Sequence, residues 1–180
     1  MLKINIPDRE FYDEETNRFF TVKGQTLCLE HSLVSLSKWE SKWCKPFITK
    51  EKKTVSETID YIKCMTLTQN VNPDIYHLID DDIIDQVNEY IDAPMTATTF
   101  SLKEKRSSSR EQITSELISY WMIALNIPFK CEKWHLNRLL TLIRVCEIKN
   151  ESPKKMSSKE LMSRNAAINE ARRKKWNTKG

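Results

Sequence analysis

Two Cys–His pairs are the first residues whose spacing could support chemistry. Cys28 and His31 are three positions apart, and Cys131 and His135 are four apart. A Cys and a His one helical turn apart can share a zinc ion with ligands from elsewhere in a fold. Both pairs lie in apolar segments without a Cys-x-x-Cys motif, where free cysteine commonly acts as a small hydrophobic side chain. We therefore predict no metal site. We also predict no Cys–His nucleophile, because nothing supplies an orienting group or an oxyanion hole.

A run of carboxylates could instead bind a hard cation or act as a general base. Asp80, Asp81, Asp82 and Asp85 precede an amphipathic pattern. The calcium-loop template needs a glycine at its sixth position, and this segment has none. Carboxylates also cap the free amides at a helix N-terminus and interact well with the helix dipole. The pattern favours capping over a cation site.

The scarcity of glycine excludes several enzyme classes. Only Gly24 and Gly180 occur in 180 residues, against a usual share of about 7%. Gly-rich phosphate loops, dinucleotide-binding turns and nucleophile elbows all need glycines that this chain lacks. Tight hairpin turns also favour glycine, so an all-β fold is excluded as well. We predict that the protein is not an enzyme and has no cofactor.

Charge is concentrated at the C-terminal end of the sequence. The whole chain carries +4; the segment 147–180 has ten Lys and Arg against four Glu, which leaves −2 on the rest. Arg172, Arg173, Lys174 and Lys175 precede Trp176, a combination that could hold phosphates and stack a base. The alternative is a basic helix that orders on binding a protein partner. The second interpretation is favoured, because the rest of the chain is slightly acidic and no recognition-helix motif is present.

Apolar spacing predicts a mainly α fold with a small N-terminal β element and a basic C-terminal helix. Alternating apolar residues and Gly24 indicate two or three short strands. Capping boxes are expected at Thr54–Glu57, Ser109–Gln112 and Ser157–Glu160, and Asn72-Pro73 is expected to start a short turn. The predicted segments are a β element over 1–29, a helical region over 30–95, a linker over 96–109, a helical hairpin over 110–148 and a tail helix over 149–180. The second hairpin helix is expected over about 132–148.

Large aromatic side chains are abundant for a core of this size. Most of the tryptophans fit helix faces, so for any single one a core position is the simpler interpretation. A surplus of rings also suits a groove that binds an apolar helix. We predict such a groove between the hairpin, over Ile113–Ile143, and Trp39 and Trp43. Its expected contact residues are Trp39, Trp43, Trp121, Phe129, Trp134 and Leu139, with Arg172, Arg173, Lys174, Lys175 and Trp176 as a second, charged contact.

Three segments of the chain carry a resemblance to a viral family. They are SYWMIALNIPFKCEKWHLNRLLTLIR (119–144), LEHSLVSLSKWESKW (29–43) and ARRKKWNTKG (171–180). In these segments the chain is similar to the tail assembly chaperones of long-tailed phages. The resemblance implies a non-enzymatic factor that binds the tape measure protein, keeps it soluble and recruits tail tube subunits. Two other classes stay open: a structural tail or baseplate component, and a small nucleic-acid-binding phage protein.

Several features of the sequence indicate the cellular compartment of the protein. Five scattered cysteines suit a reducing environment, the N-terminus has no apolar signal region, and no apolar run approaches the roughly 18 residues that cross a bilayer. Together with the resemblance, these features predict the host cell cytoplasm, no membrane partner and a possible homo-oligomer.

Overall fold

The computed structural model describes residues 1–13, 17–49, 51–100, 112–150 and 158–176. The chain divides into two compact units, Met1–Cys146 and Glu147–Gly180. The second unit begins where the basic segment begins. The described residues are mostly helical with an N-terminal β element, so the prediction of a mainly α fold is confirmed. None of the described helices is long and apolar enough to cross a membrane.

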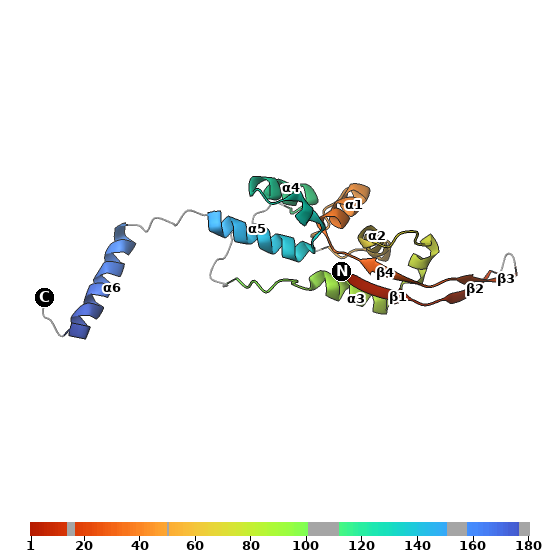
Figure 1. The fold of residues 1–180 in the computed structure, drawn as a ribbon, viewed down its shortest axis with the longest axis horizontal. Coiled ribbons are helices and arrows are strands. Elements are labelled where there is room, and N and C mark those ends of the chain that lie inside the picture. The colour runs from red at the N-terminus through yellow and green to blue at the C-terminus, as the bar shows by residue number, and fades with distance from the viewer. Residues whose placement is uncertain (14–16, 50, 101–111, 151–157, 177–180) are drawn as a thin grey trace. The chain divides into compact units, whose positions relative to one another are not determined.

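The β element is a long two-stranded ribbon (Figure 1). Strand β1 (Leu2–Ile6) pairs antiparallel with β4 (Gln25–Leu29), and β2 (Arg9–Asp13) pairs with β3 (Arg18–Val22). Alternating side chains of β1 and β4 are buried, as the period-two pattern predicts. Gly24 lies where the ribbon strands approach, and a Cβ there would come within 2.2 Å of the Ile6 carbonyl oxygen. Strand β2 was not predicted, because its polar sequence lacks an apolar alternation.

Side-chain caps define the next helices. These are α1 (Leu33–Trp43), α2 (Val55–Met65), the short 3₁₀ helix η1 (Pro73–Leu78) and α3 (Asp81–Asp92). The predicted capping box at Thr54 is confirmed, as are the caps by Asn72 and Asp80, whose oxygens accept from the Asp74 and Ile83 amides. A further capping box, between Ser32 and Ser35, starts α1 and was not predicted.

The predicted hairpin differs from the structure at the start of both helices. Helix α4 (Ser115–Ala124) follows the cap Thr114, so Gln112 does not lie in its first turn; Ser109–Glu111 fall outside the described residues. The second helix was expected from residue 132. The chain instead forms the 3₁₀ helix η2 (Phe129–Lys133) before α5 (Leu136–Asn150).

The break between η2 and α5 has a tertiary cause. His135 forms an isolated antiparallel bridge with Ser32, and the Leu136 amide donates to the His31 carbonyl at 2.7 Å. These contacts hold the chain extended at this point, beside the start of α1. A helical period cannot reveal an extended pair that depends on residues a hundred positions away.

The core of the first unit gathers side chains from the ribbon and from every helix around it. Helix α1 packs against α2 and α4 and also touches η2, while α3 lies against β1. The fully buried apolar side chains include Leu27, Leu29, Leu36, Trp39, Ile62, Met65, Ile75, Leu78, Ile118, Met122 and Leu136.

The second unit contains helix α6 (Ser158–Trp176). Taken by itself, this unit leaves the side chains of residues 162–176 exposed. An i,i+4 ion pair joins Glu170 to Lys174 at 2.8 Å. Ser157, the expected first residue of a capping box, lies outside the described residues.

Candidate interaction surface

Two of the predicted contact residues are core residues. Trp39 is 1% exposed, and its indole Nε1 donates to the Glu57 carbonyl at 3.0 Å. Its ring meets Phe47 edge-on, with centroids 5.1 Å apart. Leu139 is completely buried. Neither side chain can touch a partner while the protein is folded, so the predicted groove is wrong at these positions. Helical spacing identified their apolar faces but not that other segments of the chain cover them.

Trp43 is half-buried and already has polar partners. Its indole Nε1 donates to Asp60 at 3.1 Å, and Lys42 forms an ion pair with the same carboxylate. The Lys45 ammonium lies 5.5 Å from the ring centroid and also pairs with Glu57. Hydrogen bonding from Lys45 holds the pKa of Glu57 below its usual value. These contacts join α1 to α2. They explain the position of Trp43 without a partner protein.

Trp121 and Trp134 are both half-buried and pack against the core. The Arg138 guanidinium covers the ring of Trp134, with its central carbon 4.2 Å from the ring centroid. Stacking of this kind is a favourable cation–π contact. Both tryptophans therefore contribute mainly to packing around α4 and α5.

Large exposed apolar side chains do occur on the outer face of α4 and at the start of η2. Tyr120 is 63% exposed, Ile123 is 60% exposed and Phe129 is 59% exposed. We call these three residues the α4–η2 surface. The opposite side of α4 is also apolar, with Ile118 and Met122 fully buried. Of the predicted contacts only Phe129 belongs to this surface. Sequence reasoning missed Tyr120 and Ile123. The segment is apolar on both sides, which indicates that one side is uncovered but not which one.

Glu40 fixes the start of α4 to the rest of the unit. Its carboxylate is buried and accepts from the Ser115 amide at 2.7 Å and from the Phe47 amide at 2.8 Å. A carboxylate at this position satisfies a free amide of the first turn and meets the positive end of the helix dipole. One side chain thus joins α1, the loop after it and α4. Sequence reasoning missed it, because residues 40 and 115 share no local pattern.

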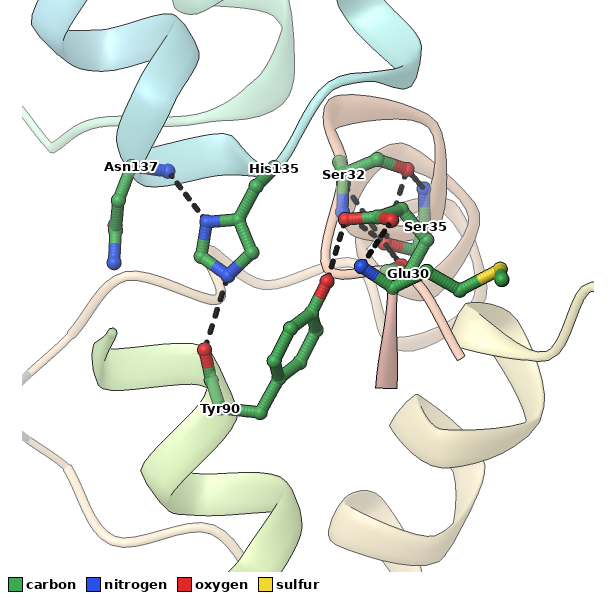
Figure 2. Close-up of polar contacts among 7 residues, drawn as sticks. Glu30, Ser32, Ser35, Tyr90, His135 and Asn137 are labelled. Atoms are coloured by element: carbon green, nitrogen blue, oxygen red, sulfur yellow. Dashed lines mark hydrogen bonds and ion pairs between the residues drawn. The ribbon is translucent and has the colours of Figure 1, made fainter. Parts of the chain in front are cut away.

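A second set of buried polar contacts joins α3 to the start of α5 (Figure 2). The Nε2 atom of His135 lies 3.0 Å from the Tyr90 carbonyl, and its Nδ1 atom lies 3.3 Å from the Asn137 amide. A carbonyl can only accept and an amide N–H can only donate. His135 is therefore neutral, with its proton on Nε2, and burial lowers its pKa.

The same contacts satisfy the C-terminus of α3. The Asn137 side-chain amide donates to the carbonyls of Ile91 and Ala93, at 2.8 and 2.9 Å. The Tyr90 hydroxyl donates to Glu30 at 2.8 Å, as Figure 2 shows. Carbonyls at a helix end have no hydrogen-bond partner within the helix. The Asn137 side chain supplies that partner here in place of water.

His31 completes the buried histidine pair. Its ring lies edge-on to that of His135, with centroids 5.1 Å apart, and its Nδ1 lies 2.5 Å from the Tyr61 hydroxyl. Burial, with a further contribution from His135, lowers the pKa of His31 to about 3. Both histidines thus have structural partners. In the part of the chain that the structure describes, no three His, Cys, Asp or Glu side chains are grouped to hold a metal ion.

The basic residues predicted as a second contact lie in the last turns of α6. Trp176 is 73% exposed. Arg172, Arg173, Lys174 and Lys175 are consecutive, so they are distributed around the helix and do not line one face. These residues belong to the second unit.

Comparisons with known proteins add no relative to this description. No protein-family model matches the chain, and no curated protein or solved structure matches it significantly.

Proposed function

We propose that this protein is a non-enzymatic tail assembly chaperone of a long-tailed phage, acting in the host cell cytoplasm. It binds apolar helical stretches of the tape measure protein, keeps that protein soluble and promotes assembly of tail tube subunits around it. The proposal combines the sequence resemblance with one structural observation, the α4–η2 surface.

The α4–η2 surface supports binding to an apolar helix. Exposed apolar patches are characteristic of interaction sites on soluble proteins, and the α4–η2 surface offers three large exposed apolar side chains from consecutive elements. Tyr120 and Ile123 are three residues apart on one helix face, the spacing with which helices present anchors to each other. The other side of α4 is packed in the core, and Glu40 holds its first turn, so the surface is presented on a fixed support.

Co-expression with the tape measure protein of the same phage tests the proposal. A soluble complex is expected, from a partner that is insoluble alone, and it should survive about 0.5 M salt because apolar contacts are not screened. Tyr120→Asp combined with Ile123→Asp should abolish the complex. Val55→Asp is the matched control, since Val55 is 68% exposed on α2, away from this surface. A tape measure protein that stays insoluble with wild type, or a complex that the double variant leaves intact, would contradict the proposal.

A nucleic-acid-binding function is the second candidate, favoured by the exposed Trp176 beside four basic residues. Retarded migration of DNA that weakens steeply with salt would support it. Replacing Arg172 and Arg173 with Gln should then reduce the salt dependence as well as the affinity. If the protein instead persists in purified virions, it is a structural tail or baseplate component.

A further inference from the structure

The outer face of α3 carries the most concentrated negative charge of the first unit. Five of its twelve residues are carboxylates, and all five are exposed: Asp81, Asp82, Asp85, Glu89 and Asp92. At 3.6 residues per turn they fall within an arc of about 100°. We call these five residues the α3 acidic face. Val87 and Tyr90, on the other side of the helix, are buried.

No basic side chain neutralises this face within the described residues. The ion pair nearest in sequence joins Arg9 to Asp80, the cap that precedes α3. The chain has no Lys or Arg between Lys63 and Lys103. Like charges on neighbouring helical turns repel each other, so the α3 acidic face is stabilised by any cation that covers it.

Helix α6 has the opposite character. It contains six Lys and Arg against two Glu, and its last turns carry Arg172, Arg173, Lys174 and Lys175. By itself the second unit covers no side chain of residues 162–176. Short isolated helices are marginal in water, so α6 gains stability from any surface that it docks on.

We propose that the α3 acidic face is a homodimer interface, and that its occupant is the basic end of α6 from a second copy of the chain. The argument is charge complementarity. Within the described residues no basic side chain pairs with the α3 acidic face, and α6 carries the largest cluster of consecutive basic residues in its unit. Exchange in both directions gives a closed two-fold dimer with two identical contacts. Helix α6 is about 28 Å long and α3 about 18 Å, so α6 is long enough to lie along α3; its basic end covers about one turn of the acidic face, through the basic side chains on the side that faces α3. The inference does not depend on the chaperone function.

Contacts of this kind are weak and sensitive to salt. Exposed ion pairs contribute little each, and several must act together. We expect a dimer with a dissociation constant on the order of 10–100 µM at about 0.05 M salt. Screening should weaken it at least about tenfold at 0.5 M salt. Sedimentation equilibrium over both salt concentrations measures these values.

Reversing the charges on α3 in one variant and on α6 in another distinguishes this dimer from dimers formed through other surfaces. One variant carries Asp85→Lys, Glu89→Lys and Asp92→Lys; the other carries Arg172→Glu, Arg173→Glu and Lys175→Glu. Each should be monomeric alone, because like-charged faces then meet. An equal mixture should restore the dimer, because both contacts become complementary again. The control Glu10→Lys, Glu51→Lys and Asp74→Lys makes the same change in net charge as the first variant, at exposed carboxylates outside α3, and should dimerise like wild type.

All three variants are expected to fold, because every altered side chain is exposed. Circular dichroism and urea unfolding check this. A wild-type protein that is monomeric at about 100 µM in low salt would overturn the proposal. So would a dimer unaffected by the two reversals, or a mixture of them that does not associate. If wild type is monomeric and a Lys-rich peptide binds α3 instead, the face serves a foreign basic partner and the homodimer is excluded.

Discussion

Helices α3 and α4 are built alike on the inside and differently on the outside. Each begins after a side-chain cap, Asp80 or Thr114, and each buries an apolar face in the same core. The outer face of α3 consists largely of carboxylates, whereas the outer face of α4 carries Tyr120 and Ile123.

The difference separates what a helix needs to fold from what it offers to a partner. A charged outer face keeps the protein soluble and attracts basic partners over a distance that salt shortens. An exposed apolar face lowers solubility and gains free energy only when another apolar surface covers it. Two classes of partner are therefore expected to use the two helices, with opposite responses to salt.

The largest effect expected from the comparison of α3 with α4 is at the start of α4. Replacing Glu40 with Ala leaves the buried amides of Ser115 and Phe47 without an acceptor and should lower the free energy of unfolding by about 3 kcal/mol. Glu116→Ala is the matched control, because this carboxylate lies in the first turn of α4, which Glu40 contacts, but is exposed. Its effect should stay below about 1 kcal/mol. Urea unfolding followed by circular dichroism measures both, and equal effects would show that Glu40 is not the anchor.

The buried histidine pair should make stability sensitive to acid. The pKa of His31 is lowered to about 3 in the folded protein, so the unfolded chain binds a proton that the folded one does not, and stability falls as pH drops below about 6.5. His31 alone should remove about 2 kcal/mol between pH 7 and pH 5, and the lowered pKa of His135 acts in the same direction. Urea unfolding at the two pH values gives the loss.

Two variants assign this acid response. His31→Asn should remove the His31 part of the pH dependence and leave the part due to His135, whereas His77→Gln, at an exposed position, should leave the whole dependence unchanged. The window above pH 5 avoids Glu57, whose lowered pKa moves its own contribution to more acidic conditions. Unchanged stability at pH 5 in the wild type would contradict the buried, neutral histidine pair.

The caps of the two helices should have similar, smaller effects. Asp80→Ala and Thr114→Ala each remove an acceptor for a first-turn amide, and each should cost about 1 kcal/mol. Asp80 also pairs with Arg9, so the Arg9→Ala variant separates the ion pair from the cap and should cost less than about 0.5 kcal/mol. If Thr114→Ala lowered the free energy of unfolding as much as Glu40→Ala, Glu40 would not be the main anchor of α4.

The outer faces themselves should hardly affect stability. Asp85→Asn and Ile123→Ser each change an exposed side chain and should shift the free energy of unfolding by less than about 0.5 kcal/mol. Only the second should raise solubility, measured as the concentration at which the protein precipitates with ammonium sulfate. A large destabilisation by Ile123→Ser would show that this side chain packs in the core.

Local signals in the sequence were reliable where one segment decides its own structure. The cap at Asp80, the capping box at Thr54 and the turn starting at Asn72-Pro73 all involve contacts within a few residues, and all three are confirmed. The start of α4 was missed because two Ser/Thr candidates lie five positions apart, and Thr114 rather than Ser109 precedes the helix. Propensity alone does not choose between such neighbours.

The candidate surface was predictable only in part. The sequence contains more large rings than a small core requires, and that surplus was the basis for predicting a groove. It could not say which rings are exposed, because the residues beside Trp39 and Phe129 do not show whether another segment covers them. The ring of Trp39 packs against Phe47, and its indole Nε1 donates to the Glu57 carbonyl. Both partners come from other segments of the chain.

The sequence by itself determined the mainly helical fold, the local caps and the division between a slightly acidic body and a basic tail, because these follow from period, composition and short-range hydrogen bonds. Only the tertiary structure decided that Glu40 holds α4, that His135 holds α3, and that Tyr120 and Ile123 rather than Trp39 are exposed. Burial and long-range hydrogen bonds depend on which segments meet, and no single segment encodes its neighbours.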